Sequence, residues 1–183
     1  MRAVIVCLII IVLSACQYHN NVDVEIIEVS TSTHESVDYI GFVRYEYIIR
    51  NNLTVPLKIH YSQIGKTYNP GIEGLESTNI LVLANVFLLF QNDTIWGTPG
   101  FGRRFESYDT TLYKSTHFKG LLELNWMLLS QLYETKYENL YANEKDFILD
   151  VIKEGVLCVK IGDSIYKIKN TKPLEYMPDG IEE

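Results

Sequence analysis

Residues 40–61 read IGFVRYEYIIRNNLTVPLKIHY, and this stretch decides the fold class. Apolar and polar side chains alternate on both sides of its centre, as expected of strands that bury one face. The apolar faces would be formed by Val43, Tyr45, Tyr47 and Ile49, and by Leu57, Ile59 and Tyr61. Asn51-Asn52 suits a turn because asparagine tolerates left-handed backbone angles, and Pro56 places an edge or a strand start there. We therefore predict a β-hairpin.

Further strands are expected on both sides of this hairpin. Val22, Val24 and Ile26 alternate with acidic residues, which predicts a half-buried strand, and the polar run from Ser30 to Ser36 predicts a loop after it. The residues from Gly65 to Ser77 are glycine-rich and indicate another loop. The apolar stretch 80–90, with Asn85 at its middle, fits two short strands or one long buried strand.

The hydrophobic period changes from two to 3.6 after Lys119. Spacings of three and four place one set of side chains on a single helical face, namely Leu122, Trp126, Leu129, Tyr133 and Tyr137. A second helix is expected to begin after Asn143, as its cap, and to end at Gly155. A closing hairpin is predicted from residues 156–161 and 164–169 around Gly162-Asp163.

The order of these elements predicts an α+β fold, a β-sandwich-like core with a C-terminal helical pair and a final β-hairpin. We expect one globular domain over residues 22–172, followed by a tail at residues 173–183. The tyrosine-rich strand, asparagine turn and apolar strand of residues 43–61 loosely resemble immunoglobulin-like modules of bacterial lipoproteins. That resemblance implies an immunoglobulin-like core.

The amino terminus has the features of a signal peptide. Arg2 precedes an uncharged apolar run, Ala3 to Leu13, that would span about 16 Å as a helix, against a hydrocarbon core of ~30 Å. The sequence Leu13-Ser14-Ala15-Cys16 then resembles the lipobox of bacterial lipoproteins. The resemblance implies cleavage between Ala15 and Cys16 and a diacylglyceryl thioether on the Cys16 sulfur.

The lipobox divides the chain into a signal peptide, residues 1–15, a lipidated tether, residues 16–21, and the domain. Gln17 follows the cysteine where an aspartate would signal retention, so the resemblance favours an outer-membrane position that faces the periplasm. The membrane, held through the lipid on Cys16, is the first expected partner. An envelope protein is the second.

Composition and motif searches disfavour several functions. A net charge of −7 disfavours nucleic acid, since binding to phosphate needs clustered lysine and arginine. The four histidines have no metal-ligand spacing, and no hydrolase elbow, phosphate loop or dinucleotide fingerprint occurs, so no metal, cofactor or catalytic residue is predicted. Cys158 has apolar flanks, which favour a small buried side chain over a reactive thiol.

One segment is a candidate ligand site. The residues from Trp96 to Tyr108 combine glycines with aromatic and basic side chains, and the candidate contacts are Trp96, Phe101, Arg103, Arg104 and Tyr108. Such a loop could stack on sugars or bind carboxylate and phosphate groups. The alternative is a mobile connection whose aromatic residues pack under the helices.

Three functional classes follow from these features. The first hypothesis is a membrane-anchored, non-catalytic binding or interaction module of the cell envelope. The second is an immunity-type lipoprotein that neutralises a toxin in the periplasm, because an acidic anchored domain suits a basic effector. The third is an envelope enzyme acting on glycan or peptide, which would need catalytic residues assembled from distant parts of the chain.

Overall fold

The structure, a computed structural model, describes residues 22–33, 40–64, 80–83, 85–97 and 105–178. Residues 1–21, with the predicted signal peptide and lipobox, lie outside the described residues. The strands are β1 (Val22–Thr33), β2 (Ile40–Asn51), β3 (Leu57–Ile64), β4 (Ile80–Leu83), β5 (Val86–Phe90), β6 (Asp93–Trp96), β7 (Phe105–Leu112), β8 (Thr116–Asn125), β9 (Val156–Ile161), β10 (Ser164–Lys169) and β11 (Leu174–Pro178). The helices are α2 (Trp126–Leu132), a π-helical segment η1 (Tyr133–Tyr137) and α3 (Glu144–Glu154).

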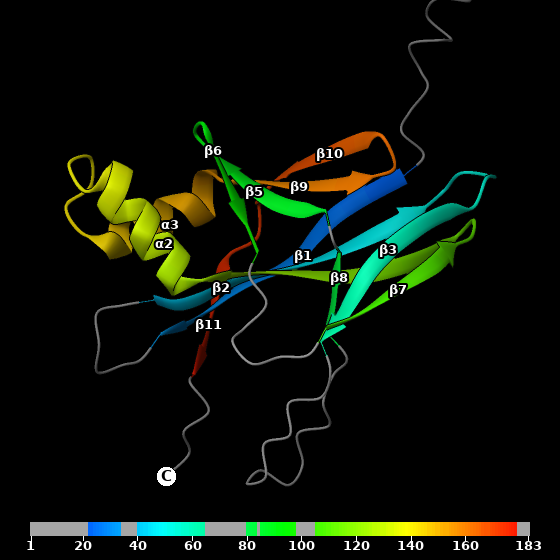
Figure 1. Ribbon diagram of the computed structural model, residues 1–183, viewed down its shortest axis with the longest axis horizontal. Coiled ribbons are helices and arrows are strands. Elements are labelled where there is room, and N and C mark those ends of the chain that lie inside the picture. Colours follow the sequence, from blue (N-terminus) through cyan, green and yellow to red (C-terminus); the bar gives the residue numbers. More distant parts are fainter. Residues whose placement is uncertain (1–21, 34–39, 65–79, 84, 98–104, 179–183) are drawn as a thin grey trace, which may run out of the picture.

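The strands form three sheets around one hydrophobic core. Sheet A has the order β11-β1-β2-β8, sheet B the order β4-β3-β7 and sheet C the order β10-β9-β5-β6. Sheets A and C face each other, sheet B lies alongside β8, and the helices lie at one end of the sandwich (Figure 1). The predicted α+β fold with a sandwich-like core is confirmed. Among the described residues, no helix is long and apolar enough to span a membrane.

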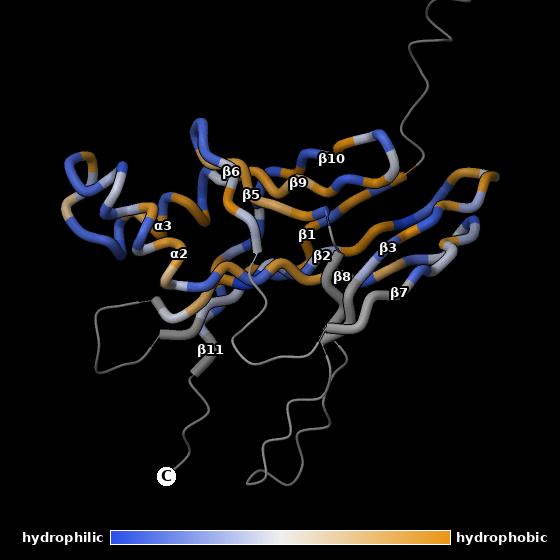
Figure 2. Tube along the Cα trace, in the orientation of Figure 1, coloured by the Kyte–Doolittle hydropathy of each residue, from blue (hydrophilic) through white to orange (hydrophobic). Residues whose placement is uncertain are grey.

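Strand β2 supplies the central row of the core. Its side chains Val43, Tyr45, Tyr47 and Ile49 are fully buried, because β1 and β8 flank the strand and sheet C and the helices cover this face. Tyr47 lies opposite Gly120 of β8, where an added Cβ would be 2.3 Å from the Tyr47 ring. The ring therefore occupies the space that the glycine leaves. Hydrophobic residues make up β5, whereas the tip of the β5–β6 hairpin is hydrophilic (Figure 2).

Strand β1 is longer than the sequence indicated. The residues from Ser30 to Thr33, predicted as part of a loop, pair with β2. A register shift between Ile26 and Glu28 is the cause, because a β-bulge moves the inward side chains from even to odd positions. After the bulge, Thr31 is buried and donates a 2.5 Å hydrogen bond to the carbonyl of Phe42.

The predicted hairpin at residues 43–61 is wrong in its pairing, although both strands exist. β2 pairs with β1 and β8 in sheet A, whereas β3 pairs with β4 and β7 in sheet B. The chain therefore crosses between sheets at residues 52–56. Alternation identifies a strand but not its partner, because the period of two is the same whichever strand lies alongside. The resemblance to immunoglobulin-like modules loses the hairpin on which it was based.

Asn51 holds this crossing with its side chain. The amide nitrogen donates to the carbonyl oxygens of Val55, at 3.0 Å, and Leu112, at 2.7 Å, and the amide oxygen accepts from the backbone of Leu53 at 2.9 Å. The Asn51 carbonyl also accepts from the amide of Ser115 at 2.7 Å. Asn51 is fully buried, so one side chain joins the end of β2 to the turn after it and to the end of β7.

The first predicted helix begins later than expected. Residues 116–125 are strand β8, and α2 starts at Trp126, where Asn125 caps it by accepting from the amide of Met127 at 2.8 Å. Leu121, Leu122 and Leu124 are all buried, so β8 buries both faces. A strand buried on both faces loses its alternation, and here its leucines imitate a helical face.

The remaining predictions for the carboxyl-terminal part agree with the structure except in the predicted tail. The cap at Asn143, the stop at Gly155 and the hairpin of β9 and β10 are confirmed. Gly155 is required for space and not for its backbone angle, since its φ of −62° is open to any residue. An added Cβ would lie 2.3 Å from the Val151 carbonyl oxygen. Residues 174–178, predicted as tail, form β11, which pairs in parallel with β1. A short edge strand with polar neighbours gives no periodic signal.

We expect Asn51→Ala to lower the free energy of unfolding by about 2–4 kcal/mol, because it removes three hydrogen bonds and leaves buried carbonyl groups unpaired. Urea unfolding followed by circular dichroism measures the change. Asn52→Ala is the matched control, since Asn52 is exposed. Equal stabilities for the two variants would contradict the role given to Asn51.

Candidate functional site

The structure describes only part of the predicted ligand loop. Phe101, Arg103 and Arg104 lie outside the described residues, so that prediction stays untested. Residues 105–108, predicted as part of this loop, belong to strand β7, in which Tyr108 is opposite Tyr61 of β3. The strand is rich in polar residues and pairs with a distant segment, which hid it from the sequence pattern. Trp96 ends β6 in sheet C.

Trp96 lines a groove between β6 and the helical segment α2–η1. The groove has a volume of about 420 Å³ and is open to solvent, and its walls are mainly apolar. The β6 wall is formed by Thr94, Ile95 and Trp96, and the helical wall by Leu128, Gln131, Leu132 and Thr135. Strand β6 is the edge of sheet C, so the groove runs along an edge that pairs with no other strand in the described part of the chain.

The side chains on the rim favour an apolar ligand surface. Trp96 is 52% exposed and rests against Phe87, with the ring centroids 4.8 Å apart. The Thr135 hydroxyl donates to the carbonyl of Gln131 at 2.7 Å, so this polar group is already partly satisfied within the helix. Leu128 and Leu132 are half-buried. The groove therefore offers an aromatic ring and aliphatic groups to a ligand, and few polar groups that would need a hydrogen bond from it.

The two walls are fastened together at the tip of the β5–β6 hairpin. Asp93 accepts a hydrogen bond from Tyr137 Oη at 2.8 Å and forms an ion pair with Lys136. The hairpin turn places Gln91 at φ 51°, a left-handed conformation that costs a non-glycine residue about 1 kcal/mol. These contacts fix the distance between β6 and the helices.

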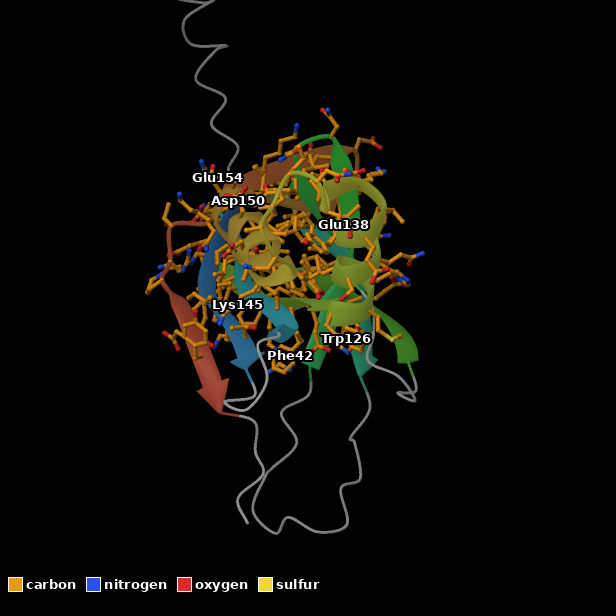
Figure 3. All side chains as sticks on the ribbon, turned by 90° about the vertical axis from the view of Figure 1, so that its left-hand side faces the viewer. Phe42, Trp126, Glu138, Lys145, Asp150 and Glu154 are labelled. Atoms are coloured by element: carbon orange, nitrogen blue, oxygen red, sulfur yellow. The ribbon has the colours of Figure 1, made fainter. Side chains whose placement is uncertain are left out.

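An aromatic cluster supports the helical wall from behind. Tyr133, Tyr137 and Tyr141 all pack around Phe147 of α3, with centroid distances of 5.7, 4.9 and 5.5 Å. The π-helical turn, closed by the bond from the Glu138 amide to the Tyr133 carbonyl at 2.8 Å, brings these tyrosines onto one side of the chain. Figure 3 shows this end of the molecule face-on, with Glu138 on one side of the helical region and Trp126 below it.

Burial and hydrogen bonding shift the titration of these groups. Burial raises the pKa of Tyr137 to about 12, and its bond to Asp93 acts in the same direction. Burial likewise raises the pKa of Tyr141 to about 12, together with a 2.5 Å bond to Asp150. The hydrogen bond from Lys136 holds the pKa of Asp93 below its usual value. Neutral Tyr137 and an ionised Asp93 are therefore the protonation states that stabilise the contacts of Asp93 with Tyr137 and Lys136.

The described residues hold little that resembles catalytic chemistry. They contain no cluster of three or more histidine, cysteine or acidic side chains that could bind a metal ion. His60 and Asp109 approach to 2.8 Å but are both largely exposed. Cys158 is buried, and burial raises the pKa of its thiol, which opposes the thiolate form that a nucleophile needs.

Comparisons with known proteins leave the function open. No protein-family model matches the chain, and no curated protein matches it significantly. A similar solved structure is a crystal structure of a protein from Archaeoglobus fulgidus, which is 12% identical and has a TM-score of 0.30. The match covers 80% of this chain and 86% of that chain. A similarity at this level supports no argument about function.

We expect the protein to lose stability as the pH rises from about 10 to 12, and Tyr137→Phe to make that loss shallower. The folded pKa of Tyr137, about 12, lies above the unfolded value of roughly 10. The contribution of Tyr137 to stability is therefore fully present below pH 10 and is lost as the pH rises to about 12. The slope reaches at most about 1.4 kcal/mol per pH unit for each such tyrosine.

Urea unfolding at a series of pH values measures this slope. Tyr176→Phe is the control, because Tyr176 is exposed in β11. An identical slope for Tyr137→Phe and the unaltered protein would show that the Tyr137–Asp93 bond does not couple to folding.

Proposed function

We propose that the protein is a lipid-anchored binding module of the bacterial cell envelope, held by Cys16 and without catalytic activity of its own. The anchor is supported by the lipobox-like residues Leu13 to Cys16 after an apolar run with Arg2 before it. An outer-membrane position facing the periplasm fits Gln17. The groove between β6 and α2–η1 is its binding surface.

The observation that carries the binding role is the half-exposed Trp96 in this groove. Tryptophan is enriched among the residues that dominate protein interfaces, and a groove with both walls fixed needs little ordering on binding. Burying the exposed half of an indole, on the order of 100 Å², gives roughly 2–3 kcal/mol. A protein partner with an apolar segment is the ligand class that this surface fits.

Photo-crosslinking in cells tests the role of the groove. A photoreactive amino acid in place of Gln131, on the rim, should capture an envelope protein, and Trp96→Ala should reduce that capture at least tenfold. Trp126→Ala is the matched control, because Trp126 is also exposed but does not line the groove. Equal capture with both tryptophan variants would overturn the assignment of the groove.

The immunity-type function is a second candidate, favoured by the charge beside the groove. Glu134 and Glu138 are exposed on and just after η1. Acidic residues in this position would steer a basic effector toward the groove. A toxin partner predicts that Glu134→Lys with Glu138→Lys abolishes protection of cells that express the protein. Protection that survives both the double variant and Trp96→Ala would remove this candidate.

A further inference from the structure

We propose that the end of the body at which β1 begins contacts the bilayer surface directly, with apolar side chains in the interfacial layer and lysines on lipid phosphates. The apolar side chains are Val55, Tyr113 and Ile165, and the lysines are Lys58, Lys114 and Lys160. This inference rests on the proposed lipid anchor at Cys16, and it adds an orientation to that anchor.

The reach of the tether restricts where the bilayer can lie. The chain from Cys16 to Val22 spans at most roughly 20 Å, at 3.3–3.6 Å for each residue. Strand β1 starts at Val22, at the end of the sandwich opposite the helices (Figure 1). A lipid on Cys16 therefore keeps this end of the body near the headgroups, whatever the direction in which the rest of the body tilts.

The pairing of the strands gathers two exposed turns at this end. Val22 lies opposite Asn51, and Asn51 lies opposite Thr116 on its other side. The turn after β2 contains Val55, and the turn between β7 and β8 contains Tyr113 and Lys114. The turn between β9 and β10 also lies next to the start of β1 (Figure 1).

The apolar side chains at this end are largely exposed to solvent. Val55 is 63% exposed, Tyr113 61% and Ile165 50%. Ile165 is opposite Lys160 in the β9–β10 hairpin, so these two side chains are neighbours on one face of the sheet. Tyrosine and aliphatic side chains next to lysines are the combination that partitions into the interfacial layer of a bilayer, because lysine can extend its ammonium to the phosphates.

The lysines at this end are available to an anionic ligand. No carboxylate of the described residues forms an ion pair with Lys58, Lys114 or Lys160. The nearby carboxylates Asp23 and Glu25 are already held by Arg50, at 3.1 and 2.9 Å.

Two further acidic residues, Asp109 and Asp163, lie at this end. Asp109 is held by His60, whereas Asp163 is exposed in the β9–β10 turn. Three lysines without an ion-pair partner among the described residues therefore stand beside two exposed carboxylates at this end, and their ammonium groups can bind headgroups even though the chain as a whole carries −7.

Two of these lysines also share a small pocket. Its lining includes Lys58 and His60 of β3, Asn85, and Lys160 and Gly162 of the β9–β10 hairpin. Its volume is about 100 Å³, the size of a single phosphate group rather than of a whole lipid headgroup. Lysines from two sheets line the pocket, and we assign it to the phosphate of one phospholipid.

Quenching by nitroxide-labelled lipid tests the orientation. The lipidated full-length protein is placed in vesicles of phosphatidylcholine and phosphatidylglycerol and labelled with a fluorophore at Tyr113→Cys. Leu140→Cys is the matched control, since Leu140 is also exposed but lies beyond η1 at the helical end. Buried Cys158 should not react. Quenching is expected to be at least threefold stronger at position 113 than at position 140.

A charge-reversal variant tests the role of the lysines in the same quenching experiment. Lys58→Glu with Lys160→Glu should reduce quenching at position 113 at least twofold in vesicles that contain phosphatidylglycerol. Unchanged quenching in this variant would remove the phosphate site, and equal quenching at positions 113 and 140 would overturn the orientation. Flotation with the vesicles separates the two proposals: protein that floats but shows equal quenching contradicts only the orientation, whereas protein that carries no lipid contradicts the anchor.

Discussion

The two-sided pairing of β2 is the constraint on which the rest of the structure depends. With β1 on one edge and β8 on the other, the inward side chains of β2 cannot reach solvent, and sheet C and the helices cover them. The Tyr45 hydroxyl lies 3.5 Å from the carbonyl of Ile152, which ties this row to α3. The chain can then leave the row only at its end, where Asn51 directs it into sheet B. The positions of the groove and of the end of the body at which β1 begins both follow from this arrangement.

Local features of the fold could be predicted from the sequence where a single residue type decides them. The sequence predicts Asn143 as a helix cap and Gly162-Asp163 as a hairpin turn, and only Gly162 of that pair has a positive φ, as a type II′ turn requires. Errors arose where the hydrophobic phase changes within an element. The bulge after Ile26 shifted β1, and burial on both faces made β8 resemble a helix.

The candidate site shows the same division. Trp96 could be singled out because an aromatic residue beside a glycine-rich segment stands out locally. Leu128 and Leu132, on the opposite wall, fall within the predicted first helix, and nothing in their spacing indicates a groove. The groove depends on Asp93 reaching Tyr137 and Lys136 across 44 and 43 positions of the chain. A contact of that kind is set by the tertiary fold.

These features describe a body with two different ends. The end where β1 begins carries exposed apolar side chains and lysines, and the helical end carries acidic residues such as Glu134 and Glu138. The groove lies between β6 and the helices, away from the start of β1 (Figure 1). An anchor at one end and a binding surface toward the other would let the protein present its groove to a partner in the periplasm.

Mass spectrometry of the protein extracted from the cell envelope tests the central claim most directly. The account predicts an amino-terminal peptide that begins at Cys16 and carries a diacylglyceryl thioether, with no signal for residues 1–15. With Cys16→Ser, it predicts an unprocessed chain without lipid. A Cys16→Ser protein cut at the same bond and still bound to membranes would contradict it.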